Sequence, residues 1–170
     1  MNGYLTPVRG GLFLAFSTLM FGIFLGVAFG VAEYSIKEFV RTAVSLHPDL
    51  HGPKSSAGIW RYAQRAHFHS AGIGAFTIGL IILVAFTTMR DRLKSATAIL
   101  IGLGGLYPLS WFSMFLLAPS MGARAAHGAL PTEFLAYAGT GCLLVGIAML
   151  AGNLFLGWGS ASRHQVAVAE

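Results

Sequence analysis

The sequence predicts an all-α integral membrane protein, a bundle of four transmembrane helices with an amphipathic surface helix in its first connection. Of the 170 residues, 55% are hydrophobic and only 10% are charged, whereas soluble domains carry about 25% charged residues. Four apolar runs also reach the roughly twenty residues that a helix needs to cross the hydrocarbon layer. The length predicts one transmembrane domain, residues 1–170.

The four spans are expected at about residues 11–31, 67–89, 96–118 and 131–158. The first run is longer than a signal-peptide core and no cleavage site follows it, so we expect a retained helix. The charged segment at residues 90–95 predicts a tight turn between antiparallel second and third spans.

Three prolines mark the third and fourth spans. Pro108 lies inside the third span and is expected to kink it, because proline lacks an amide hydrogen. Pro119 is expected to end the same span. Pro131 suits the first turn of the fourth span, where its fixed φ angle favours a helix start.

The connection at residues 33–66 contains the predicted amphipathic helix, which should stop at His47 because the residue before a proline disfavours helix. A loop is expected at residues 49–58. Ser55 or Ser56 could cap a helix that begins near Gly58, in which case the second span starts well before His67. We expect the apolar face of the helix to lie on lipid or on a partner subunit. Its apolar positions are Ile36, Phe39, Val40, Ala43 and Val44.

Small residues recur every four positions on three spans, as in Gly22, Gly26 and Gly30 of the first. Such stripes allow helices to approach closely where lipid removes the hydrophobic driving force. We expect these stripes to pack within the bundle. They would suit packing against partner membrane subunits or in a homo-oligomer for the same reason.

The eleven lysines and arginines lie between the apolar runs and form no basic stripe, so nucleic acid is not an expected partner despite the net charge of +5. An even number of spans places both termini on one side. The three positive charges within residues 90–95 favour cytoplasmic termini, and a bacterial inner membrane is the expected location.

Five of the six histidines are expected at one end of the bundle: His47 and His51 in the first connection, His67 and His69 at the start of the second span, and His127 in the third connection. The sixth, His164, falls in the tail on the other side. Neutral imidazole is a preferred ligand of haem iron and of copper. Residues two apart on a helix point about 200° from each other, so His67 and His69 should address different partners.

The stretch Ala66-His67-Phe68-His69, followed by small residues and Gly74-Ala75-Phe76, resembles the His-Phe-His helix of haem–copper terminal oxidases. The resemblance covers about fifteen of the 170 residues and implies haem ligation by His67 or His69. A His-His pair and a His-x-x-x-Tyr motif are absent from the sequence, so the resemblance does not extend to an oxygen-reducing centre.

Three further positions suit a haem held by His69. Arg61, Arg65 and His69 share one helix face, so the arginines are expected to pair with the propionates. Gly72 leaves room for the porphyrin. His127, His51 or His47 would supply the opposite ligand.

The leading functional hypothesis is a membrane electron-transfer subunit that binds haem b and links a quinol pool to a redox partner, as part of a membrane oxidoreductase. Catalytic residues are not assigned, because no Ser-His-Asp set, paired acids or phosphate loop is present. Two alternatives remain open. One is a cofactor-free accessory subunit of a larger membrane complex, and the other is a copper-binding membrane protein that uses the five histidines.

Overall fold

The computed structural model describes residues 2–161, and helices account for nearly all of them. His164 therefore lies outside the described residues. The elements are α1 (Asn2–Leu5), η1 (Thr6–Val8), α2 (Arg9–Ser45), η2 (Pro48–Leu50), α3 (Ser55–Ala85), α4 (Asp91–Leu103), α5 (Leu106–Met121), α6 (Ala123–His127) and α7 (Leu130–Leu156).

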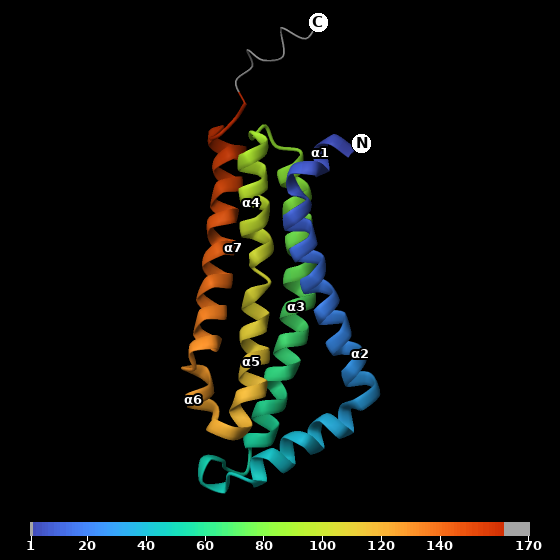
Figure 1. Ribbon diagram of the computed structural model, residues 1–170, viewed down its shortest axis with the longest axis vertical. Helices are drawn as coiled ribbons and strands as arrows, with labels where there is room; N and C mark the ends of the chain where they lie inside the picture. Colours follow the sequence, from blue (N-terminus) through green and yellow to red (C-terminus); the bar gives the residue numbers. More distant parts are fainter. Residues whose placement is uncertain (1, 162–170) are drawn as a thin grey trace, which may run out of the picture.

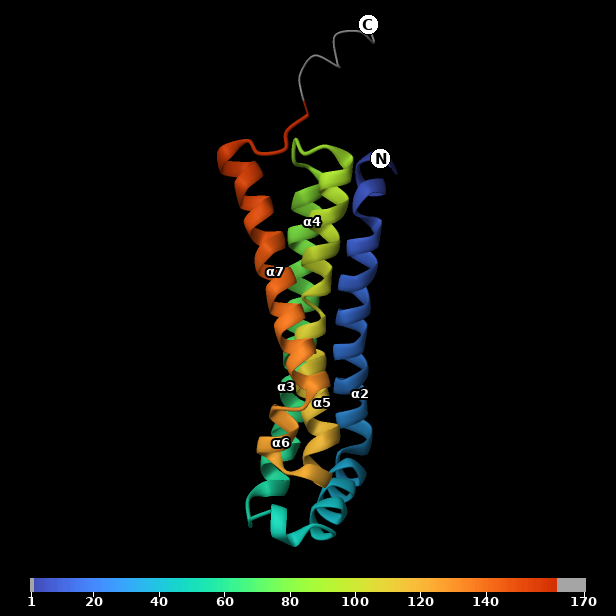
Figure 2. The ribbon, with the colours of Figure 1, turned by 60° about the vertical axis from the view of Figure 1, so that its left-hand side comes forward.

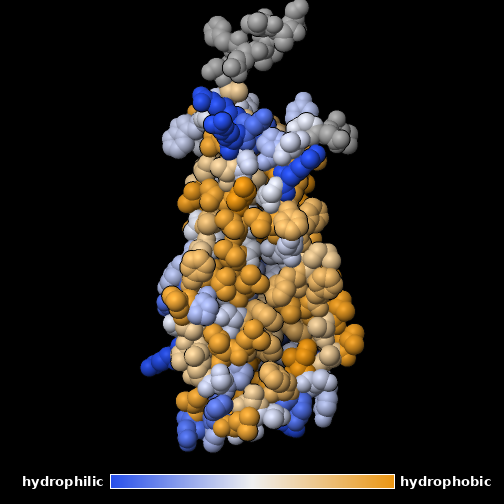
Figure 3. All heavy atoms as spheres, viewed as in Figure 1, coloured by the Kyte–Doolittle hydropathy of each residue, from blue (hydrophilic) through white to orange (hydrophobic). Residues whose placement is uncertain are grey.

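Four segments of the described chain are long and apolar enough to cross a membrane, which confirms the predicted all-helical architecture. They are α1 to α2, α3, α4 with α5, and α7. Figure 3 shows hydrophobic side chains over most of the middle of one face and hydrophilic ones gathered toward both ends. Large apolar side chains such as Phe13, Val31 and Phe155 point outward, as a lipid environment would favour.

The helices run side by side along the length of the molecule (Figures 1 and 2). The α1 end holds α1, the turn between α3 and α4, and the end of α7, whereas the α6 end holds η2 and α6. Residues 2 and 161 thus lie at the same end, as four spans require. The α4–α5 segment is central: it packs against α2, α3 and α7, and α7 packs mainly on α4 and α5.

The predicted surface helix is the second part of α2 and not a separate element. The helix bends at Ala32, whose φ of −126° and ψ of 21° are not helical, and then runs across the α6 end (Figure 1). No proline or glycine occurs in residues 31–45, so hydrogen bonding resumes after the bend and continues to Ser45.

The apolar face of this segment packs on the chain itself, which corrects the expectation of lipid or a partner subunit. Val40 is 1% exposed and lies in a cluster with residues of α3 and α5, including Ile59, Ala63 and Phe115. Phe39, at the edge of the predicted apolar face, stays on the surface of the protein with 60% of its area exposed.

The second span begins at Ser55 and ends at Ala85. It therefore starts before residue 67, where the apolar run begins, and includes the helix that the serines at 55 and 56 suggested near Gly58. The charged segment at residues 90–95 does not form the turn between the second and third spans, because α4 already begins at Asp91. The carboxylate of Asp91 suits the positive end of the helix dipole. Lys94 folds back, and its Nζ donates a 2.9 Å hydrogen bond to the Ala85 carbonyl at the end of α3.

The third span is interrupted at Gly104 and Gly105, between α4 and α5. Pro108 explains the break, because its missing amide hydrogen leaves the carbonyl of Gly104 without its α-helical donor. Pro119 does not end α5, contrary to the prediction. The helix continues to Met121 and stops at Gly122, whose φ of +80° is a left-handed conformation.

Candidate functional site

His67 and His69 lie near the middle of α3, not at its start, because the helix begins twelve residues before His67. Their side chains point to different neighbours, as their spacing predicts: His67 contacts α2 and His69 contacts α5. The two residues therefore have to be assigned separate roles.

The imidazole of His67 joins α3 to α2. Its Nδ1 donates a 2.7 Å hydrogen bond to the carbonyl oxygen of Gly22. A Cβ added at Gly26 would lie 2.7 Å from His67 Cε1, so the ring occupies the space that this glycine leaves. The edge of Phe29 packs against the same ring at 5.8 Å between centroids. These contacts give His67 a structural role in helix packing.

The imidazole of His69 has the tautomer of a metal ligand. Its Nδ1 lies 2.8 Å from the carbonyl oxygen of Arg65, and a carbonyl can only accept, so Nδ1 carries the proton. In the neutral imidazole the lone pair is therefore on Nε2, for which the described residues provide no hydrogen-bond donor. A backbone carbonyl that fixes Nδ1–H in this way is the usual second partner of a metal-binding histidine.

A shallow groove of about 330 Å³ runs along the outward face of α3 beside His69. Nothing lies within 4 Å of the position that a Cβ of Gly72 would take, so this wall is flat and open. The groove contains no second histidine. Its lining residues are Phe68, His69, Gly72, Ile73 and Phe76.

Two aromatic rings of α5 hold the other side of His69. Tyr107 meets the imidazole edge-on at 5.5 Å between centroids, and the ring of Trp111 lies 6.0 Å away. The guanidinium of Arg65 stacks over Trp111 at 4.7 Å. Arg61 and Arg65 are exposed, and neither is in an ion pair within residues 2–161. Both guanidinium groups are therefore available to bind an anionic group beside this part of α3.

The other three candidate histidines lie at the α6 end and in different surroundings. His51 Nε2 donates a 2.9 Å hydrogen bond to the carbonyl of Pro119, which ties the η2 loop to α5. His47 is exposed after the end of α2, and His127 ends α6. Over the part of the chain that the structure describes, no three His, Cys, Asp or Glu side chains converge on a common point.

A pocket between α5, α6 and α7 was not predicted from the sequence. Its volume is about 260 Å³, and it contains His127 together with three aromatic residues and one carboxylate. Its residues come from three helices, and the sequence does not show which helices meet. The one sequence feature that pointed to the pocket is the carboxylate of Glu133 at the start of an apolar run. The lining residues are Tyr107, Ser110, Trp111, Met114, His127, Thr132, Glu133, Ala136 and Tyr137.

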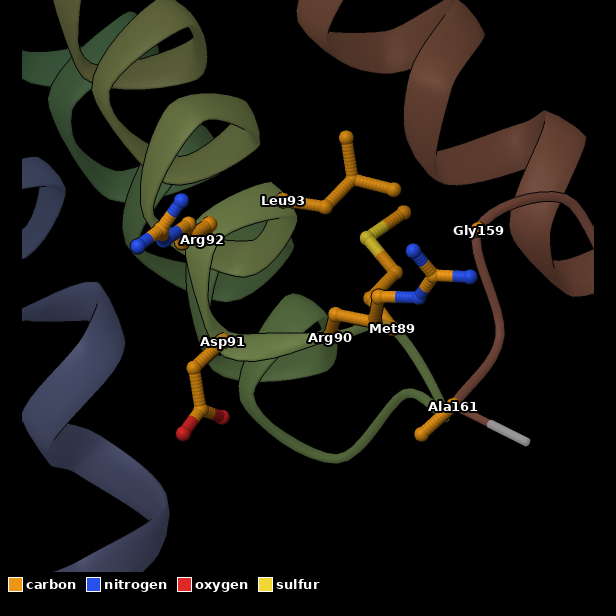
Figure 4. A pocket seen from close by; sticks show the side chains of 7 residues that line it. All are labelled: Met89, Arg90, Asp91, Arg92, Leu93, Gly159 and Ala161. Atoms are coloured by element: carbon orange, nitrogen blue, oxygen red, sulfur yellow. The ribbon is translucent and has the colours of Figure 1, made fainter. Parts of the chain in front are cut away.

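A hollow of about 790 Å³ lies at the α1 end. Figure 4 shows that its charged side chains do not converge: Arg90 points toward the segment of Gly159, whereas Asp91 and Arg92 point elsewhere. This hollow has no arrangement of donors or charges that would select a ligand.

A haem attached through one histidine would use His69 Nε2, with the open face at Gly72 beside it and Arg65 one turn away. For copper, the described residues offer pairs at most. No known protein family, no curated protein and no solved structure matches this chain, so its site is defined by this geometry alone.

Proposed function

We propose that the chain is an integral membrane subunit that binds haem b through His69 and passes electrons between a quinol pool and a redox partner. The observation that carries the proposal is the hydrogen bond from His69 Nδ1 to the Arg65 carbonyl, which leaves Nε2 as a lone-pair donor beside an open groove. A single proximal histidine is sufficient to hold a haem iron.

The surroundings of His69 support a flat, partly charged ligand. Gly72 presents no side chain to a porphyrin face, and the aromatic rings of Phe68 and Phe76 flank the groove. Arg61 and Arg65 lie toward the polar α6 end on the same side of α3, where propionates would find their counter-ions. The haem supplies the one-electron chemistry when bound, and the protein supplies ligation and charge.

The lining of the groove includes no second histidine. His47, His51 and His127 lie at the α6 end and do not line it. One ligand of the haem iron, His69, would therefore come from this chain.

A visible spectrum of the protein purified from haem-sufficient cells tests the proposal. We expect a Soret band that sharpens on reduction with dithionite, and saturable recovery of that band when haem-free protein is titrated with haemin. Haem-free protein that takes up no haemin in the titration would rule the proposal out. Metal analysis of the same sample separates a copper-binding protein, which would carry copper without a Soret band.

The alternative of a cofactor-free accessory subunit is favoured by the outward glycines. At Gly72 and Gly79 of α3 and at Gly141 of α7, nothing lies within 4 Å of the position that a Cβ would take, so these residues leave flat outer faces. In a bilayer, such faces allow a partner helix to approach closely. Co-purification with other membrane subunits and a colourless sample would support this function.

A further inference from the structure

The pocket between α5, α6 and α7 exists because these helices are joined above and below it. On one side, a Cβ at Gly139 would collide with the backbone of Tyr107, so α7 and α5 touch there. On the other side, the hydroxyls of Ser113 and Thr132 lie 2.9 Å apart. Between these two contacts the helices enclose about 260 Å³.

The pocket has polar groups that no described residue satisfies. The indole Nε1 of Trp111 is buried and has no hydrogen-bond partner among residues 2–161. Leaving a buried N–H unsatisfied costs about 1–3 kcal/mol, so such a group usually has a partner. The side chains of Glu133 and His127 also make no hydrogen bond or ion pair within this part of the chain. All three residues line the pocket, so a ligand there has one N–H donor, one carboxylate and one imidazole among its neighbours.

The remaining walls are aromatic or small. Tyr107, Trp111 and Tyr137 supply three rings, and no lysine or arginine lines the pocket. A phosphorylated ligand would therefore meet a carboxylate without a counter-ion, which disfavours it. The volume lies near the lower limit of small-molecule sites, roughly 300 Å³, so it suits one ring and excludes a haem.

One wall of the pocket belongs to an exposed apolar surface of α7. Tyr137 is 73% exposed on the outside of α7, next to the exposed side chains of Phe134 and Leu130. A ligand with a polar ring and an apolar tail would place the ring against Trp111 and lay the tail along this surface. Lipid-soluble quinones and quinols have this combination of a flat ring, oxygens at opposite ends and an apolar chain.

We infer that the pocket of α5, α6 and α7 binds the ring of a quinone or quinol, with Trp111 Nε1 donating to one ring oxygen and Glu133 accepting from a quinol hydroxyl. The inference names a site for the quinol of the proposed function. It does not require a haem at His69, because that residue is not among those that line the pocket.

The test is binding of decylubiquinone and of its reduced form to the full-length wild-type protein, prepared without haem, in lipid nanodiscs. The absence of haem makes the result independent of the haem proposal, and the ring of His69, which packs on Tyr107 and Trp111 of the pocket wall, stays in place. We expect saturable binding that exceeds partition into empty nanodiscs. Trp111→Phe keeps a ring and removes only the N–H donor, and it should weaken binding about two- to tenfold. Trp60→Phe is the matched control, because this indole of α3 packs against Phe29 of α2, away from the pocket.

A second variant tests the carboxylate. Glu133→Gln should weaken binding of the quinol more than that of the quinone, since only the quinol donates a hydrogen bond to Glu133, whereas Glu38→Gln should change neither. Binding no greater than partition into empty nanodiscs would overturn the inference. Equal losses in Trp111→Phe and Trp60→Phe, or a Glu133→Gln protein that keeps wild-type affinity for both forms, would also overturn it.

Discussion

His67 of α3 donates a 2.7 Å hydrogen bond to the backbone carbonyl of Gly22 in α2. This side chain crosses the interface between two spans at a point where the first span carries glycines at positions 22 and 26. Gly26 of α2 therefore makes room for the imidazole ring of His67, in addition to allowing a close approach of the two helices.

Removal of this ring should loosen the bundle. His67→Ala loses the hydrogen bond and leaves a cavity beside Gly26, and we expect a loss of about 1–3 kcal/mol of unfolding free energy. His67→Asn keeps an N–H near the Nδ1 position and should lose less. Unfolding in mixed micelles measures both variants. Equal destabilisation by the two variants would show that the hydrogen bond does not contribute.

Substitution at Gly22 should be more harmful than at Gly30 on the same helix. A Cβ at Gly22 would lie 2.6 Å from the amide nitrogen of Ala71, a backbone atom that cannot move alone, whereas nothing lies within 4 Å of one at Gly30. We expect Gly22→Ala to destabilise by about 1–3 kcal/mol. Gly30→Ala should be neutral or stabilising by up to about 1 kcal/mol, because alanine favours helix. The same unfolding assay compares them, and a harmless Gly22→Ala would contradict the packing described for α2 and α3.

The bent segment of α2 should depend on Val40 and not on its neighbour Phe39. Val40→Asp places an unpaired charge in an apolar cluster, and we expect a loss of about 3–5 kcal/mol or failure to fold. Phe39→Asp changes an exposed side chain and should alter the unfolding free energy by less than about 0.5 kcal/mol. Its effect should instead be weaker association of the segment with the membrane surface. Similar unfolding curves for the two variants would place this segment away from α3 and α5.

The fold was predictable to the level of four helical spans, because the hydrocarbon thickness fixes the length of the apolar runs. The boundaries were less predictable. Residues 55–66 contain Arg61, Gln64 and Arg65 and fall outside the apolar run, yet they are helical. The serines at 55 and 56 pointed to a helix start near Gly58, whereas the apolar run alone placed the start of the span at about residue 67. Outside a lipid layer a helix needs no apolar run, and residues 55–66 contain no proline that would end it.

The site was predictable only in part. Helix geometry predicted that His67 and His69 face different ways, and the contacts of the two rings confirm this. It did not predict that His67 packs into α2, because the neighbour of a helix face depends on tertiary structure. The pocket at Trp111 and Glu133 was missed for the same reason, since its residues lie on separate helices.

The arginines near His69 should set the potential of the haem without being needed to hold it. Arg61→Ala should keep the Soret band and lower the midpoint potential, because a nearby positive charge favours the reduced, less positive iron. Arg92→Ala, at the α1 end, should leave the potential unchanged. A redox titration followed in the visible spectrum measures all three proteins. An unchanged potential in Arg61→Ala would remove this arginine from the haem site.

The optical spectrum of the His69→Ala protein, measured beside His67→Asn, tests the central claim most directly. We predict that the wild type and His67→Asn bind haem with the same Soret band, because His67 only joins α3 to α2. His69→Ala should fold and lose the band, since it lacks the one imidazole of the groove. A His69→Ala protein that retains the wild-type Soret band would contradict haem ligation by His69.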